Sequence, residues 1–148
     1  MIDTIRLKDH IYDVVGAVQT VHKELGPGLN ESCYQEGLQI EFTQKNIPFQ
    51  REISFHPSYR GIKMKATFRL DFLCKNDIIV ECKSVPKLTA DHRAQLFNYL
   101  RLLKLSCGIL VNFLPQYAEI ERYFYDEERQ LIVPVNHMVK GRKTESNN

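Results

Sequence analysis

The stretch DFLCKNDIIVECKS, residues 71–84, decides the fold. Two apolar segments flank the Asn-Asp pair at 76–77, and this pair favours a turn, so the pattern predicts a β-hairpin. Side chains alternate along a strand, which places Glu81 and Lys83 on one face of the second strand. Folding of the hairpin then brings Asp71, at the start of the stretch, close to both. The hairpin is therefore expected to gather two carboxylates and one amine in an apolar region.

Burial of ionised groups has a cost that the sequence must offset. An unpaired carboxylate in an apolar interior costs several kcal/mol unless it is paired or binds a cation. One interpretation is a salt-bridge cluster, in which Lys83 neutralises one of the two acids. The other is a divalent metal site with Asp71, Glu81 and the backbone carbonyl of Cys82 as ligands, since hard cations such as Mg²⁺ (or Mn²⁺) take oxygen ligands. The grouping favours the metal site, with Lys83 beside the water that attacks a phosphodiester, and both interpretations remain open at this point.

The remaining sequence predicts an α/β fold, a mixed central β-sheet flanked by helices in the order α-α-β-β-β-α-β. Apolar residues recur at helical spacing in the first helix, which the GPG run ends, and Asn30 is a good cap for the second. The segment YRGIKM at 59–64 indicates a turn into a short strand. The expected helices are 3–25, 31–45 and 90–103, and the expected strands are 50–58, 67–75, 78–83 and 107–113, with an edge strand at 119–125.

Composition bounds the class of protein. The 148 residues suit one domain, expected at 1–135, followed by a polar tail at 136–148 that we expect to be disordered. No signal peptide or membrane-spanning run is visible, which predicts a cytoplasmic protein without membrane contact. The net charge of +2 is too small to indicate nucleic-acid binding by itself. Three of the four cysteines lie in apolar runs, which favours buried, reduced thiols over a zinc or iron–sulfur site: Cys74, Cys82 and Cys107.

At this point the motifs resemble a known family. A strand with Asp71, followed by a strand that ends in Glu81-x-Lys83, resembles the signature of the PD-(D/E)XK nuclease superfamily. The stretch GLNESCY at 28–34 resembles the motif of the GxxExxY proteins within it. The segments YRG, RLDF, VECK, QLFNYLRL and GILVNF follow in the same order, so the resemblance covers roughly residues 5–125. One departure is Leu70, which stands where the superfamily name has proline.

The resemblance implies a restriction-endonuclease-like core of the RecB-type branch, with five site residues: Asp71, Glu81, Lys83, Glu31 and Gln95. The first three match the core catalytic positions. Glu31 matches an acid on an early helix that reaches the metal, although a helix also favours an acid at its N-terminus without any such role. Gln95, one turn before Tyr99, matches a glutamine that lies near the lysine. It also reads as an ordinary polar residue at a helix boundary.

The expected function is that of a Mg²⁺-dependent nuclease, with Mn²⁺ as the other candidate cofactor. Nucleic acid is the expected partner, with DNA favoured over RNA, and a homodimer is left open. The alternative is a catalytically weak or inactive nuclease-fold module that binds nucleic acid or a protein. Three cations after the active strand could meet phosphates or could equally form a solvated helix face: Lys87, Arg93 and Arg101.

Overall fold

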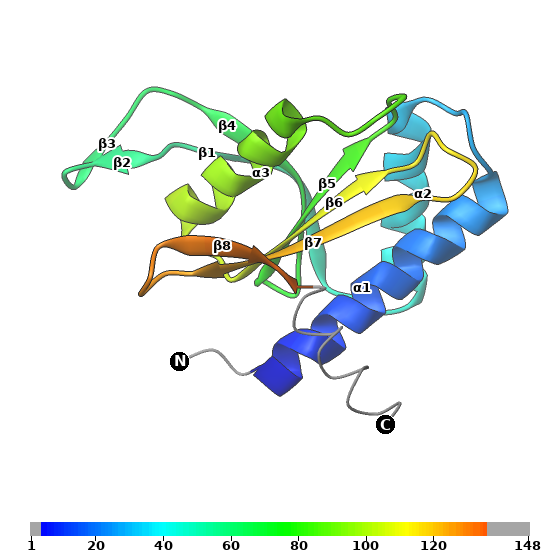
Figure 1. Cartoon of the computed structure of the whole chain (residues 1–148), viewed down its shortest axis with the longest axis horizontal. Coiled ribbons are helices and arrows are strands. Elements are labelled where there is room, and N and C mark those ends of the chain that lie inside the picture. Colours follow the sequence, from blue (N-terminus) through cyan, green and yellow to red (C-terminus); the bar gives the residue numbers. More distant parts are fainter. Residues whose placement is uncertain (1–3, 136–148) are drawn as a thin grey trace.

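The computed structural model describes residues 4–135 and contains three helices and eight strands within that range (Figure 1). The predicted tail at 136–148 lies outside the described residues. The elements are α1 (Thr4–Leu25), α2 (Glu31–Gln44), β1 (Phe49–Phe55), β2 (Ser58–Tyr59), β3 (Ile62–Lys63), β4 (Phe68–Cys74), β5 (Ile78–Lys83), α3 (Ala90–Leu103), β6 (Cys107–Asn112), β7 (Glu119–Asp126) and β8 (Leu131–Pro134).

Local capping sets the beginning of the second and third helices. The Asn30 side chain accepts a hydrogen bond from the Cys33 backbone N–H at 3.1 Å, which caps α2 as the sequence predicts. Thr89 and His92 form a reciprocal capping box at the start of α3. His92 is therefore engaged in holding the helix end. Helix α3 ends before Lys104, which adopts the left-handed conformation.

The six-stranded sheet has the order β1-β4-β5-β6-β7-β8, and β5 and β6 are its parallel pair. Every residue of β6 is buried, as is typical of a strand that is covered on both faces. Helix α3 makes the crossover between the two parallel strands. The expected strand at 119–125 forms, but it is not the edge of the sheet, because β8 pairs along its outer side. The sequence analysis missed β8, a short strand whose four residues show no alternation of buried and exposed side chains.

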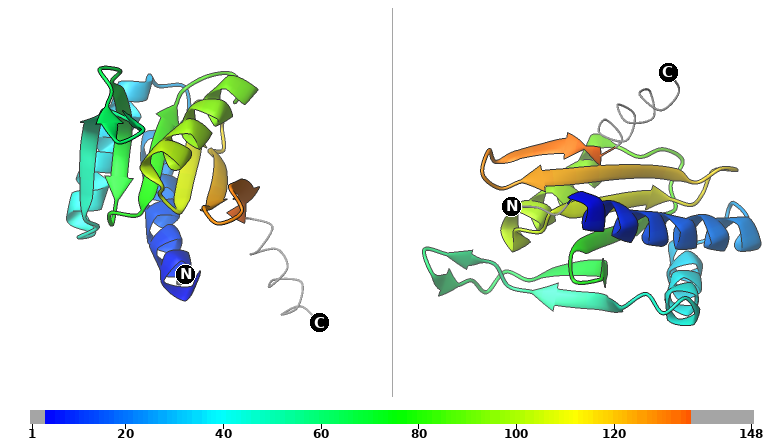
Figure 2. Two further views of the ribbon diagram at one scale, coloured as in Figure 1. Left: turned by 90° about the vertical axis from the view of Figure 1, so that its left-hand side faces the viewer. Right: turned by 90° about the horizontal axis from the view of Figure 1, so that it is seen from below.

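The helices cover both faces of the sheet (Figure 2). Helices α1 and α2 pack on one face, in a core that includes Phe72, Val80 and Val111. Helix α3 packs on the other face, against Ile79 and Leu110. The alternating sides of Ile79 and Val80 on β5 confirm the period of two on which the predicted site depends.

A change of face interrupts the β1–β4 ribbon. Phe49 of β1 packs on the side of α1 and α2, whereas Ile53 and Phe55 of the same strand pack on the side of α3. Residues four apart on a regular strand share a face, so the ribbon turns over between them. Glu52 lies at the turnover with a positive φ of 55°, a conformation uncommon for a residue with a side chain. The turnover directs the far part of the ribbon across α3.

The cysteines and the membrane expectation can be compared with the structure directly. Cys74, Cys82 and Cys107 are buried and Cys33 is partly buried, and all four are free thiols. The prediction that the three strand cysteines are buried is confirmed. Within residues 4–135 no helix has the length and apolar character that a membrane crossing requires.

Candidate active site

The predicted hairpin forms, and it brings Asp71 and Glu81 together. Strands β4 and β5 pair antiparallel from Cys74–Ile78 to Phe72–Val80. The connecting residues at 75–77 contain two with positive φ, Lys75 and Asn76, as expected for a tight turn. Beyond Phe72–Val80 the next residues in the same register are Asp71 and Glu81. Hairpin register alone therefore carries both acids to the end of the paired region.

At this point side-chain hydrogen bonds replace the backbone hydrogen bonds between β4 and β5. The Glu81 carboxylate accepts a hydrogen bond from the Asp71 backbone N–H at 2.8 Å through Oε2. Asp71 in turn accepts from the Cys82 backbone N–H at 2.8 Å through Oδ2. Each acid thus uses one carboxylate oxygen to hold the other strand, and neither Oδ1 of Asp71 nor Oε1 of Glu81 has a partner among residues 4–135. The arrangement fixes both carboxylates and leaves one oxygen of each available.

Burial makes the Glu81 carboxylate costly to ionise. Glu81 is only 3% exposed. Burial, and then the neighbouring Asp71 charge, raise the pKa of Glu81 to about 8, although the hydrogen bond from Asp71 and the Lys83 charge oppose the shift. Burial also raises the pKa of Asp71, which the hydrogen bond from Cys82 and the charge of Lys83 partly offset. The two acids share a site that favours either a proton or a cation.

Lys83 does not pair with either acid. Its Nζ donates to Oε1 of Gln95 on α3 at 3.1 Å. Gln95 also hydrogen-bonds with the Tyr99 hydroxyl one turn later. The structure therefore brings Lys83 and Gln95 together as the sequence analysis expected. Among residues 4–135 neither Asp71 nor Glu81 takes part in an ion pair. The salt-bridge cluster in which Lys83 would neutralise one of the two acids therefore does not form.

Glu31 is the first residue of α2. Hydrogen bonds tie the preceding loop, residues 26–30, to the segments that follow β5 and β6, and we call this arrangement the clamp. Gly28 has a φ of 85°, which favours glycine, and its backbone N–H donates to the Leu114 carbonyl at 3.1 Å. The Ser84 hydroxyl, just beyond β5, donates to the Leu29 carbonyl at 2.5 Å. The strand end and the start of α2 are thus tied together, and Figure 1 shows them at the same edge of the sheet. Burial and then the Asp71 charge raise the pKa of Glu31, whereas Lys83 lowers it.

Tyr34 completes the clamp and explains the spacing of the GxxExxY stretch. Its ring stacks on Phe113 with centroids 4.5 Å apart, and the side chain is fully buried. Its hydroxyl donates to the Gly26 carbonyl at 2.5 Å and accepts from the Leu29 N–H at 3.1 Å. Tyr34 therefore packs and holds the loop before Glu31, a structural role in agreement with its burial. A glycine, an acid and a tyrosine at these positions serve one local geometry.

Two residues near Asp71 escaped the sequence analysis. Glu52, at the turnover of β1, adds a negative charge that raises the pKa of Asp71. Arg69, exposed two residues before Asp71, lowers that pKa. No local pattern marks either residue, because both read as ordinary solvent-facing positions on a strand. Pairing of β1 with β4 places Glu52 beside Asp71, whereas Arg69 lies two residues away on the same strand as Asp71.

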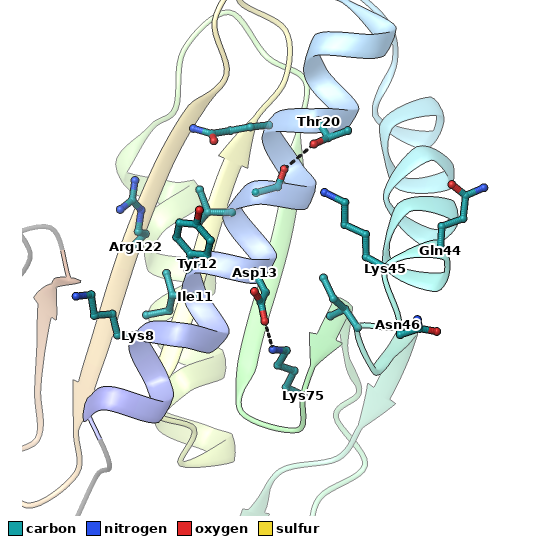
Figure 3. Close-up of a pocket in the computed structure, with 14 residues that line it drawn as sticks. Lys8, Ile11, Tyr12, Asp13, Thr20, Gln44, Lys45, Asn46, Lys75 and Arg122 are labelled. Atoms are coloured by element: carbon teal, nitrogen blue, oxygen red, sulfur yellow. Dashed lines mark hydrogen bonds and ion pairs between the residues drawn. The ribbon is translucent and has the colours of Figure 1, made fainter.

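Other candidates take structural roles. Arg93 donates two hydrogen bonds to the Glu121 carboxylate, at 2.7 and 2.8 Å, so it is neither a solvated cation nor ready for phosphate. The pocket in Figure 3 lies along α1 and holds an ion pair of Asp13 and Lys75 at 2.5 Å. It contains none of the five predicted site residues.

A divalent ion is compatible with the donors at this site. Among residues 4–135 no three His, Cys, Asp or Glu side chains are grouped as a set that could hold a metal by themselves. Magnesium does not need such a set, because it is commonly held by one or two carboxylates together with waters and substrate phosphates. Asp71 and Glu81 supply two fixed carboxylates, each with one oxygen left for a ligand.

Comparison with known proteins gives the family. No curated protein matches the chain. The fold is similar to the crystal structure of SSO0001, with a TM-score of 0.51 and 23% sequence identity. The likeness covers 67% of this chain and 53% of that one, so this chain spans about half the length of SSO0001. At this identity the likeness concerns the fold alone. The family model of the PD-(D/E)XK nuclease superfamily matches residues 8–123, which is most of the chain and includes the hairpin and α3. The chain therefore belongs to the PD-(D/E)XK nuclease superfamily.

Proposed function

We propose that this protein is a divalent-metal-dependent nuclease that hydrolyses phosphodiester bonds, with Mg²⁺ as its cofactor and Mn²⁺ as a substitute. The observation that carries the proposal is the pair of fixed, largely buried carboxylates at the split end of the β4–β5 hairpin, neither of which forms an ion pair among residues 4–135. A buried carboxylate pair needs a proton or a cation to be stable. A divalent cation bound there would supply the metal ion that metal-dependent hydrolysis of a phosphodiester uses.

The proposed ligands are Asp71, Glu81, the Cys82 carbonyl and Glu31. Asp71 and Glu81 have the fixed geometry described above. Glu31 is held at the same edge of the sheet, where burial and then the Asp71 charge raise its pKa. A divalent ion held by these oxygens would supply Lewis-acid polarisation of the phosphate and acidify the attacking water.

The chain's own groups have separate tasks. Lys83 would place its ammonium group against the negative charge that builds on the phosphate, and would assist the attacking water. Gln95 accepts a hydrogen bond from Lys83 and is bonded to Tyr99, so it keeps the ammonium in place. Lys83 is not consumed by an ion pair with the acids, which leaves its charge for the substrate.

We also propose the finer assignment within the superfamily. The spacing of Gly28, Glu31 and Tyr34, with the clamp that these residues build, supports membership of the GxxExxY group. The contact of Lys83 with Gln95 supports the RecB-type branch. Residues 1–135 as one domain, a cytoplasmic location and DNA as the favoured substrate remain part of the proposal.

The test is a cleavage assay on single-stranded, double-stranded and structured DNA and RNA, with Mg²⁺, Mn²⁺ or EDTA. The proposal expects cleavage that EDTA abolishes and that Asp71→Asn lowers by at least about a hundredfold. Asp91→Asn, an exposed acid in the first turn of α3, is the matched control and should cleave like the parent. Failure to cleave any substrate with either metal would leave the alternative, a nuclease-fold module that binds without catalysis.

A further inference from the structure

The β1–β4 ribbon continues beyond the sheet as an arm, which we define as residues 56–67. Figure 1 shows β2 and β3 projecting away from the body of the protein, past α3, and Figure 2 shows the same projection from below. Strands β2 and β3 pair with each other and with no other strand. The arm therefore stands apart from the sheet on a ribbon that begins at the acidic site.

Hydrogen bonds hold the arm in one shape. The Met64 backbone N–H donates to the Pro57 carbonyl at 2.8 Å, and the His56 ring bonds the Ala66 carbonyl at 3.1 Å. At the tip, Arg60 and Gly61 both have positive φ, which is the geometry of a type I′ hairpin turn. Pairing is thus maintained from the sheet to the tip, and the arm does not have to order itself when a ligand arrives.

At the root of the arm, two aromatic residues anchor it to α3. The rings of Phe55 and Phe68 stack on each other at 5.6 Å, and both make edge contacts with Tyr99, at 5.9 and 6.1 Å. Tyr99 also bonds Gln95, which holds Lys83. The direction of the arm is therefore fixed relative to the candidate active site.

The charge of the arm has one sign. The arm and the three residues after it, 68–70, include no Asp or Glu, although the whole chain has 18 acids and 20 Lys and Arg. The four cations of this stretch are Arg60, Lys63, Lys65 and Arg69. All four are exposed, and none of them has an ion-pair partner among residues 4–135. Tyr59 and Ile62 are 62% and 72% exposed, and the Arg60 guanidinium lies over the Tyr59 ring at 5.4 Å. The cations predicted from the sequence to meet phosphates all lie after β5, outside this segment.

We propose that the arm binds the phosphate backbone of a nucleic-acid duplex to one side of the cleaved bond. This inference rests on the proposed function, since it extends the same substrate beyond the active site. A rigid two-stranded ribbon with exposed cations and an exposed aromatic ring matches a polyanion whose major groove admits such a ribbon. Arg69, exposed between the tip and Asp71, continues the cationic track to the site.

The reach of the arm sets the substrate length at which it acts. Ile62 and Asp71 are nine positions apart, which corresponds to at most about 30 Å at about 3.3 Å per residue. A duplex rises about 3.4 Å per base pair, so the arm would contact phosphates up to roughly nine base pairs from the cleaved bond. Duplexes that extend this far on the arm's side should gain the full affinity from it, and shorter ones should gain less.

The test measures duplex binding by fluorescence anisotropy, in EDTA so that no cleavage occurs, with labelled duplexes of 30 and 8 base pairs. The arm variant carries Arg60→Ala, Lys63→Ala and Lys65→Ala. The control variant removes the same charge from α1 and from the C-terminal cap of α2 through Lys8→Ala, Lys23→Ala and Lys45→Ala, all exposed positions, of which Lys45 pairs with Glu41. Circular dichroism and a thermal melt establish that both variants fold.

The arm variant should bind the 30-base-pair duplex at least tenfold more weakly than the control, with a salt slope lower by about two to three. The difference between the two variants should be clearly smaller on the 8-base-pair duplex, which is too short to span the site and the whole arm together. Equal affinities and slopes on the long duplex would overturn the arm's role, while metal-dependent cleavage by the parent would leave the proposed function standing. Binding through the arm by a parent that cleaves nothing would support the arm and remove the nuclease.

Two other occupants of the arm are separate outcomes. If labelled poly-glutamate binds as tightly as the duplex and loses as much affinity in the arm variant, the arm serves an acidic protein, and the inference is wrong. If the parent sediments as a dimer that the arm variant lacks, with duplex binding unchanged, the arm serves a second copy of the chain, and the inference is wrong as well.

Discussion

Replacement of Glu81 by glutamine should stabilise the metal-free protein, and more so as the pH rises. Burial beside Asp71 raises the pKa of Glu81 from 4.5 to about 8. The folded protein therefore retains a proton that the unfolded chain releases above about pH 4.5, and rising pH favours unfolding until about pH 8. Glutamine does not titrate, and its carbonyl oxygen can still accept the hydrogen bond from the Asp71 N–H.

The magnitude follows from the size of the shift. One pKa unit corresponds to about 1.4 kcal/mol, so the stability that Glu81 contributes falls by roughly 5 kcal/mol in total across this pH window. Between pH 6 and pH 8 the free energy of unfolding of the parent should fall by about 2 kcal/mol relative to Glu81→Gln. The titrating groups away from Glu81 are shared, so their contributions cancel in the difference, and Asp71 is the neighbour whose own titration changes with Glu81.

Urea denaturation at pH 6 and pH 8, first in EDTA and then in Mg²⁺, measures both effects. At ten times its dissociation constant, Mg²⁺ should add about 1.4 kcal/mol to the parent at pH 8 and clearly less to Glu81→Gln. Parallel pH dependences in EDTA would refute the reasoning about burial. Equal stabilisation of both proteins by Mg²⁺ would refute the role of Glu81 as a ligand.

Three further results are expected. Lys83→Ala should lower cleavage by at least about a hundredfold while the melting temperature stays near that of the parent, with exposed Lys23→Ala on α1 as the unaffected control; a large loss of melting temperature that Asp71→Asn restores would instead indicate a structural salt bridge. Gly108→Ala should destabilise the protein by about 1–3 kcal/mol in urea denaturation, because its Cβ would lie 2.7 Å from Leu96 Cδ1, whereas Gly16→Ala in α1 meets nothing within 4 Å and should not destabilise; equal effects of the two changes would contradict this packing. Thiol titration of the native protein should leave Cys74, Cys82 and Cys107 unreactive until denaturant is added, because all three are buried and burial raises the pKa of Cys74 and Cys107 to about 12. Rapid labelling of the native protein would contradict this.

The core of the candidate site could be predicted because it depends on short-range rules. Alternation along β5 placed Glu81 and Lys83 on one face, and the turn between the two strands set the register that carries Asp71 to Glu81. Helical spacing gave the bounds of α3, whereas Gln95 within it was a candidate only through the family resemblance. A sequence pattern suffices where a few consecutive residues fix the geometry.

Long-range pairing accounts for what the sequence did not predict. Glu31 was a candidate only through the family resemblance, since its position depends on contacts of the preceding loop with Ser84 and Leu114, far along the chain. Glu52 reads as an exposed strand residue until the ribbon is seen to turn over there. The pairing of Arg93 with Glu121 joins α3 to β7, two elements that no local pattern relates.

The central claim is that Asp71 and Glu81 hold a divalent ion. Calorimetric titration of Mn²⁺ into the parent, Asp71→Asn and the control Asp91→Asn tests this claim without requiring a substrate. The account predicts binding by the parent and by the control, with affinity that rises with pH as protons leave the two acids, and at least about tenfold weaker binding by Asp71→Asn. Binding of equal strength in all three proteins, or no binding to the parent, would contradict it.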